Sequence, residues 1–238
     1  MSALGVLYVV GTPVGNLKDI TLRALETLQA VDAIACEDTR QTGKLLAHHQ
    51  IRKPMVSLHD HNERQKTPEL VRELEAGRSI ALVSDGGTPL ISDPGWLVVR
   101  RAIDAGARVE WIPGPVAAIG GLVLSGLPTE RFVFEGFLPV KSGARRRRLE
   151  ELKSESRTIV LYESPHRLLK ALADIREVLG EAPIACAREL TKMHEEVRRG
   201  SVGDLIEHFQ QHAPRGEFVL VVSANPRTRS PEHPGAAR

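Results

Sequence analysis

The stretch SIALVSDGGTPLISDPG, residues 79–95, joins an apolar run to a loop rich in glycine, proline and aspartate. The run Ser79–Val83 lacks polar alternation, which is typical of a strand buried on both faces of a parallel sheet. The loop Ser84–Gly95 carries three glycines, two prolines and two aspartates. A loop that only connects two elements rarely needs so many residues with special backbone conformations. Backbone N–H groups here can bind a carboxylate or hydroxyl, and Asp85 can accept from ribose hydroxyls or an amino group. The stretch predicts a strand followed by a ligand-binding loop.

The same pattern recurs on both sides of this stretch. Short apolar runs, each followed by a helical segment, cover Leu4–Val10, Val31–Cys36, Met55–Leu58 and Arg108–Ile112. The helix after the third run is expected over Thr67–Ala76, ended by Gly77. Repeated strand–helix units predict a parallel sheet covered by helices on both faces, here an N-terminal α/β domain over residues 1–115. The Gly-Pro turns and acidic pairs follow the strands, at the edge where open α/β sheets bind ligands.

The pattern changes after Pro128. Strands are expected over residues 131–138, 157–163, 184–187 and 217–223, with helices entering at Lys141 and spanning 167–179 and 201–211. This predicts a C-terminal α/β domain over residues 116–224 with a mixed sheet. The tail, residues 225–238, is rich in Pro, Arg and Ser and is predicted to be disordered.

Composition narrows the class of protein. The chain has 238 residues, 42% of them hydrophobic, and a net charge of +2, too weak to require a nucleic-acid partner. Cys36 and Cys186 lie in apolar runs, which fits unpaired thiols in a reducing cytoplasm. The N-terminal apolar run is too short to span a membrane. His59 and His61 have no third ligand at suitable spacing, so no metal site is predicted.

Two glycine-rich turns follow strands of the first domain, and the first of them matches neither of two familiar nucleotide-binding motifs. Gly11-Thr-Pro-Val-Gly15 lacks the G-x-G-x-x-G pattern of dinucleotide-binding folds, and no Lys-Ser/Thr follows it as in a P-loop. Its glycines allow close backbone approach, either to a ligand or within a tight turn. The helix after Pro113-Gly-Pro115 consists almost wholly of small residues, which suits packing against a neighbouring element or against a flat ligand.

A basic run follows the domain boundary. Lys141 and Arg145, Arg146, Arg147 and Arg148 place five cations in eight residues. Cations at a helix start are opposed by the helix dipole, which favours a phosphate-contacting surface. The alternative is a solvated helix start, with charge offset by Glu150 and Glu151.

Several motifs together resemble one family. They are Val10–Thr21 (VGTPVGNLKDIT), Glu37–Arg40 (EDTR), Ser84–Gly95, Ser125–Thr129 (SGLPT), Phe134–Pro139 (FEGFLP), Tyr162–Arg167 (YESPHR) and Arg188–Lys192 (RELTK). Over residues 4–224 the chain resembles the ribosomal RNA methyltransferases of the tetrapyrrole-methylase superfamily. Two positions depart from the family pattern: Gly86 replaces Ala, and Val116 replaces Ser and removes a candidate hydroxyl contact. The chain is also shorter after Asn225 than many members.

The resemblance implies a two-domain tetrapyrrole-methylase-like fold with S-adenosylmethionine bound between the domains. It implies 2′-O-methylation of a cytidine ribose in the decoding region of small-subunit ribosomal RNA, by a homodimer acting on the assembled subunit. The cofactor-binding residues expected by motif position are Pro13, Asp85, Gly87, Thr88, Pro89, Ile91, Val116, Ala117 and Tyr162. The expected RNA-binding residues are Arg40 and Arg145, Arg146, Arg147 and Arg148.

The chemistry leaves the catalytic residue open. A ribose hydroxyl is a poor nucleophile, so a general base is expected to contribute roughly 10²–10⁴-fold. The candidates are Glu163, Glu189 and Lys192, each beside a strand end of the second domain, and Lys192 could instead bind a phosphate. Two other functions remain open: methylation of a tetrapyrrole carbon by the same fold, and a non-catalytic RNA-binding assembly factor.

Overall fold

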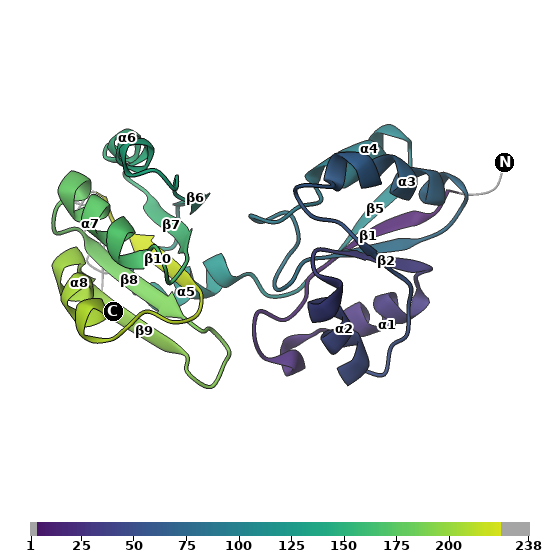
Figure 1. Ribbon diagram of the computed structural model, residues 1–238, viewed down its shortest axis with the longest axis horizontal. Coiled ribbons are helices and arrows are strands. Elements are labelled where there is room, and N and C mark those ends of the chain that lie inside the picture. Colours follow the sequence, from purple (N-terminus) through teal and green to yellow (C-terminus); the bar gives the residue numbers. More distant parts are fainter. Residues whose placement is uncertain (1–3, 225–238) are drawn as a thin grey trace, which may run out of the picture. The chain divides into compact units, whose positions relative to one another are not determined.

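The computed structural model of the chain describes residues 4–224, and the tail predicted to be disordered lies outside them. The chain folds as two compact units, and the division falls between Val116 and Ala117 (Figure 1). One unit contains a parallel sheet and the other a mixed sheet, which confirms the α/β class expected from the sequence. No helix within residues 4–224 combines the length and apolarity that crossing a membrane requires.

The sheet of the first unit has five strands in the order β3-β2-β4-β1-β5. They are β1 (Val6–Val10), β2 (Ala33–Cys36), β3 (Met55–Ser57), β4 (Ile80–Val83) and β5 (Arg108–Ile112). All neighbouring pairs are parallel, so the carboxyl ends of the five strands lie along one edge. Every residue of β4 is buried, as its unbroken apolar sequence predicts.

Helices cover both faces of this sheet (Figure 1). The helical elements of the unit are η1 (Leu17–Asp19), α1 (Leu22–Ala30), α2 (Thr39–His48), α3 (Glu63–Glu75) and α4 (Trp96–Asp104). On one face, Leu28 of α1 and Leu46 of α2 pack with Val83. On the other, Leu74 of α3 and Val98 of α4 pack in a second core. Burial of each such side chain contributes about 1.5–3 kcal/mol, so both helix layers hold the sheet edge in place.

The second unit has a five-stranded mixed sheet in the order β6-β7-β10-β8-β9. Its strands are β6 (Phe132–Phe137), β7 (Thr158–Glu163), β8 (Pro183–Arg188), β9 (Glu196–Ser201) and β10 (Phe218–Val222). The edge strand β6 runs parallel to β7, and the remaining pairs are antiparallel.

The helices of this unit lie on opposite faces of its sheet. They are α5 (Ala117–Ser125), α6 (Ser142–Leu152), α7 (Leu168–Leu179) and α8 (Val202–Gln211). Leu149, Leu172 and Leu205 carry α6, α7 and α8 onto the face that includes Phe218. The short helix α5 packs on the other face, where a Cβ on Gly121 would lie 2.5 Å from the Val219 side chain. The small residues of α5 thus serve close packing, one of the two alternatives raised by the sequence.

One helix start and one strand differ from the sequence-based expectations. Helix α3 begins at Glu63 rather than Thr67, and Pro68 lies inside it instead of in its first turn. Proline favours the first turn of a helix, yet α3 accommodates Pro68 one turn further along. Strand β9 was not expected, because its sequence EVRRGS has no apolar alternation; it is an edge strand fixed by pairing with β8.

Candidate active site

Three loops leave the carboxyl edge of the parallel sheet and are joined through their backbones. The Thr12 N–H donates to the Gly87 carbonyl over 2.8 Å, and the Gly87 N–H donates to the Thr12 carbonyl over 2.9 Å. These bonds link the loop after β1 to the loop after β4. The Thr88 hydroxyl donates to the Pro115 carbonyl over 3.4 Å and so links the loop after β5. The Gly-Pro-rich segments therefore form one connected loop assembly.

Gly11 and Gly114 determine how closely two of these loops approach. A Cβ on Gly11 would lie 2.6 Å from the Gly114 Cα, and a Cβ on Gly114 would lie 2.7 Å from the Gly11 backbone. Neither position accepts a side chain without separating the loops. The close approach that the sequence indicated at Gly11 is therefore met by a neighbouring loop of the same unit.

The loop Ser84–Gly95 has a strained backbone. Leu90 and Ser92 have φ angles of 73° and 69°, in the left-handed region that residues other than glycine seldom adopt. Such strain costs on the order of 1–3 kcal/mol per residue and persists only where the surroundings impose it. One restraint is Glu63 of α3, whose Oε1 accepts the N–H groups of Gly95 and Leu97 over 3.0 and 2.9 Å. No local sequence signal reveals this cap on α4, because Glu63 lies more than 30 residues before the N–H groups that it accepts.

Acidic side chains gather at the same edge. The Asp38 N–H, at the start of α2, donates to Asp85 Oδ1 over 3.0 Å. Burial, followed by the nearby carboxylates of Asp85, Asp93 and Asp60, raises the pKa of Glu37 to about 7. Asp85 thus has a structural contact and also adds negative charge to a group of carboxylates that suits a cationic ligand.

The expected cofactor-binding residues are distributed over both units. Those in loops of the first unit are Pro13, Asp85, Gly87, Thr88, Pro89, Ile91 and Val116; Ala117 and Tyr162 belong to the second. The Ser84 hydroxyl, at the start of the strained loop, is buried without a hydrogen-bond partner among residues 4–224. A buried polar group without a partner is costly, so this orphan atom is a further candidate for contact with a ligand.

Tyr162 lies on the α5 face of the second sheet. It is paired with Val219, which packs against α5, and its hydroxyl accepts the Ala118 N–H over 3.1 Å. The rings of Phe134 and Phe137 lie 5.1 and 5.7 Å from the Tyr162 ring. Tyr162 therefore joins the start of α5 to an aromatic cluster at the end of β6.

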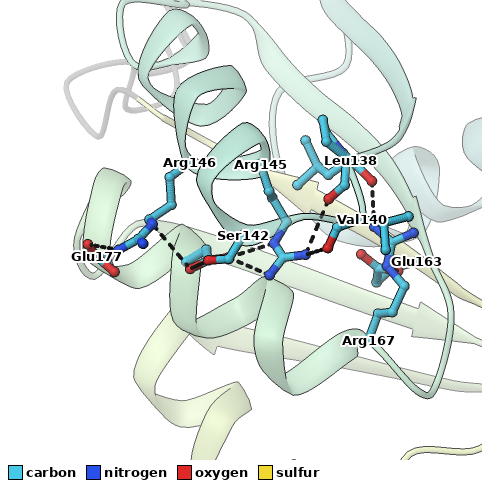
Figure 2. A network of polar contacts seen from close by, with 10 residues as sticks. Leu138, Val140, Ser142, Arg145, Arg146, Glu163, Arg167 and Glu177 are labelled. Atoms are coloured by element: carbon cyan, nitrogen blue, oxygen red, sulfur yellow. Dashed lines mark hydrogen bonds and ion pairs between the residues drawn. The ribbon is translucent and has the colours of Figure 1, made fainter.

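Glu163 faces the opposite side of the sheet from Tyr162. It is only 2% exposed, accepts the Ser164 N–H over 2.8 Å, and lies 3.3 Å from Arg167 Nε (Figure 2). Burial raises the pKa of the Glu163 carboxyl, and Arg167 and Arg145 only partly oppose that rise. A carboxylate beneath α6 and α7 is poorly placed to meet a large substrate.

Glu189 and Lys192 form an accessible pair in the loop between β8 and β9. Lys192 Nζ donates to Glu189 Oε1 over 2.9 Å, and both side chains are partly exposed. Glu189 and Thr191 have φ angles of 50° and 64°, again in the left-handed region. The Glu189 carboxylate occupies the space that a side chain at Gly216 would need. Of the three catalytic candidates, these two are presented to solvent.

The four consecutive arginines do not form one basic surface. Arg145 is 3% exposed, and its Nε donates to Asp174 over 2.6 Å (Figure 2). Arg146 pairs with Glu177 over 2.6 Å and Arg148 with Glu135 over 2.7 Å. The expectation of a common phosphate-contacting surface therefore needs correction, because helical periodicity turns Arg145 into the core and brings acids from β6 and α7 to its neighbours.

Three exposed cations differ in their acidic partners: Arg40 and Arg147, which are expected to bind RNA, and Lys141. Arg147 and Lys141 are exposed and have no acidic partner within residues 4–224. Arg40, with its side chain 86% exposed, pairs with Asp38 over 2.7 Å and lowers the pKa of that carboxyl to about 2. Only Arg147 and Lys141 thus combine exposure with unneutralised charge in this group.

The structure offers no preformed metal site in the part of the chain that it describes. No group of three or more His, Cys, Asp or Glu side chains within residues 4–224 is arranged to hold an ion. The His59 and His61 rings lie 6.0 Å apart, and Asn62 holds the turn between them by accepting the His59 N–H over 2.9 Å.

Comparison with known proteins identifies the protein family of the chain and several similar proteins. The family model for tetrapyrrole (corrin/porphyrin) methylases matches residues 6–206, and the chain belongs to this family of methyltransferases. The ribosomal RNA small subunit methyltransferase I of Synechocystis sp. is 54% identical, over 95% of this chain and 82% of its own. The protein of the same name from Escherichia coli O157:H7 is 53% identical, over 93% and 78%. These values confirm the resemblance carried by the motifs.

Solved structures agree on the fold. Diphthine synthase aligns with a TM-score of 0.74 at 16% identity, covering 92% of this chain and 90% of that protein. A uroporphyrin-III C-methyl transferase from Thermus thermophilus, complexed with S-adenyl homocysteine, aligns with a TM-score of 0.64 at 18% identity, over 92% and 98%. At these identities the likeness concerns the fold alone.

Proposed function

We propose that the chain transfers a methyl group from S-adenosylmethionine to the 2′-oxygen of a cytidine ribose in the decoding region of small-subunit ribosomal RNA. We place this activity in the cytoplasm and assign it to a homodimer acting on the assembled small subunit. The observation that carries the proposal is 53–54% identity, over more than nine-tenths of the chain, to proteins named ribosomal RNA small subunit methyltransferase I.

The loop assembly of the first unit fits S-adenosylmethionine by its chemistry. The cofactor carries a sulfonium and an amino group, both cationic, and the edge offers Asp85 beside Glu37 and Asp38. The orphan Ser84 hydroxyl adds a polar group in need of a partner. The residues proposed to hold the cofactor in this unit are Pro13, Asp85, Gly87, Thr88, Pro89, Ile91 and Val116.

S-adenosylmethionine supplies the methyl group and a sulfur leaving group, so this chain has to align the reactants and manage one proton. Alignment of reacting groups is worth on the order of 7–11 kcal/mol. The reaction forms an oxygen–carbon bond, breaks a sulfur–carbon bond and releases the proton of the 2′-hydroxyl. The partly exposed Glu189 is favoured over the buried Glu163 to accept that proton, with Lys192 orienting Glu189 or binding an adjacent phosphate.

Methyl transfer from labelled cofactor to small subunits from a strain that lacks the activity tests this proposal. The expected result is one labelled nucleotide, which maps to a cytidine of the decoding region and carries the label on its ribose. Label in a uroporphyrinogen-type substrate instead would establish the rival tetrapyrrole activity. Absence of cofactor binding by calorimetry would favour a non-catalytic assembly factor, and light scattering measures the dimer separately.

A further inference from the structure

The loop that joins β6 to α6 is held from the inside by two arginines. Arg145 Nη1 donates to the carbonyls of Pro139 and Val140 over 3.3 and 3.1 Å, and Arg167 Nη2 donates to the Leu138 carbonyl (Figure 2). Three consecutive carbonyls are thus bound. We call the segment Phe137–Lys141 the strap.

The two arginines are fixed in turn by buried acids. Asp174 accepts from Arg145 over 2.6 Å and from the Ser142 hydroxyl over 3.0 Å. Glu163 lies 3.3 Å from Arg167 Nε. A planar guanidinium that is paired on one side and bound to carbonyls on the other has little freedom, so the strap keeps one shape. Such preorganisation reduces the ordering cost of binding a partner.

Within five residues the strap carries exposed apolar and cationic groups. Phe137 is 52% exposed and Val140 is 75% exposed. Lys141 is exposed and has no acidic partner within residues 4–224, and Arg147 follows it on α6 in the same condition. Extended chain spans about 3.3–3.6 Å per residue, so the Cα atoms of Phe137 and Lys141 are separated by no more than about 14 Å. That is the scale of one or two nucleotides.

An exposed aromatic ring next to unneutralised cations is the composition with which proteins bind single-stranded nucleic acid. We propose that the strap is a platform for single-stranded RNA, in which the Phe137 ring stacks on a base and Lys141 binds a neighbouring phosphate. Arg145 and Arg167 are positioning residues beneath it. This inference rests on the proposed function and adds Phe137, which lies outside the basic run, to the proposed RNA contact.

Replacement of Phe137 tests the stacking contact. Alanine substitution of a stacking ring costs about 1–3 kcal/mol per base, so Phe137→Ala is expected to weaken binding about 5- to 150-fold. Phe137→Trp keeps a stacking surface and should stay within a few-fold of the parent. Binding is measured to unmodified small subunits and to oligouridylate of about ten nucleotides. Unchanged binding in Phe137→Ala, or equal losses in both variants, would overturn the proposal.

Lys141→Ala tests the phosphate contact against a matched control. Each lost phosphate contact lowers the slope of log K against log salt by about 0.7 for single strands. Lys170→Ala removes another exposed lysine without an acidic partner in the described chain, on α7, and should leave both affinity and slope unchanged. Equal slopes for Lys141→Ala and the parent would exclude the contact.

Two further readouts separate this proposal from its alternatives. The Phe137 ring contacts Tyr162, so cofactor affinity by calorimetry should fall in Phe137→Ala, but much less than RNA affinity. A loss of cofactor affinity as large as the loss of RNA affinity would place the ring at the cofactor instead. If Phe137→Ala changes the mass measured by light scattering, the ring belongs to an interface between copies and the platform is rejected. The oligouridylate assay reports on the strap even if methyl transfer to ribosomal RNA fails, so failure of the proposed function is distinguishable.

Discussion

Glu37 changes charge near neutral pH because burial, and then its acidic neighbours, raise its pKa. Its pKa of about 7 in the folded protein exceeds the ordinary value of 4.5, which the unfolded chain restores. Between those values the folded state binds more protons, so the stability contributed by Glu37 is present at low pH and is lost as pH rises from about 5 to 8. We expect the Tm of Glu37→Gln to approach that of the parent at pH 5 and to exceed it increasingly toward pH 8. If the difference in Tm between Glu37→Gln and the parent is the same at every pH in that range, Glu37 does not titrate there.

Asp85 combines a structural and a proposed cofactor contact, and two substitutions separate them. In Asp85→Asn the amide oxygen can still accept the Asp38 N–H, while the negative charge is lost. A hydrogen bond to a charged group is worth about 1.5–3 kcal/mol, so we expect cofactor affinity to fall about 10- to 150-fold at nearly unchanged Tm. Asp85→Ala should lose affinity and also some stability. If calorimetry finds parental affinity in a folded Asp85→Asn, the carboxylate is not part of the site.

At the scale of elements, α6 shows how one helix gives adjacent arginines different roles. Arg145 is buried against Asp174, whereas Arg147 faces solvent. Removing one partner of a buried ion pair costs about 3–5 kcal/mol because the other charge stays unpaired. We therefore expect Arg145→Ala to lower the Tm strongly and Arg147→Ala to stay within about 0.5 kcal/mol of the parent. A double variant, Arg145→Met with Asp174→Leu, should recover much of the stability; if it melts like Arg145→Ala, the buried pair is not the cause.

The same helix shows why part of the site escapes prediction from sequence. The five strand–helix units of the parallel sheet were predictable, because apolar runs ending in Gly-Pro loops are local signals. A parallel sheet brings the loops after β1, β4 and β5 to one edge, where hydrogen bonds join them. The run of four arginines, however, does not indicate which arginine is buried, because Asp174, the acid that pairs with Arg145, is on α7. The cap that Glu63 forms on α4 and the hydrogen bond from Arg167 to the Leu138 carbonyl are long-range contacts of the same kind.

Over the whole molecule, the modest net charge of +2 conceals local groups of like charge. Carboxylates gather at the loop edge of the first unit, where Glu37, Asp38 and Asp85 interact. Exposed cations without acidic partners in residues 4–224 occur in both units, among them Arg52 of the first and Lys141 and Arg147 of the second. Net charge alone is a poor guide to the partner, because local carboxylates suit a cationic ligand and local cations suit an anionic one.

The two cysteines provide one reporter for each unit. Cys36 and Cys186 are free and buried, and burial raises the pKa of both thiols, so neither should react with a thiol reagent until its unit opens. Cys36 ends β2 beside the loop assembly, whereas Cys186 lies in β8 of the second unit. A ligand at 100 times its Kd stabilises the state that binds it by about 2.7 kcal/mol, equivalent to roughly 100-fold slower labelling through opening. We expect saturating S-adenosylmethionine to slow the labelling of Cys36, followed by mass spectrometry, more than that of Cys186. Slower labelling of Cys186 with no change at Cys36 would move the principal cofactor contacts away from the first unit.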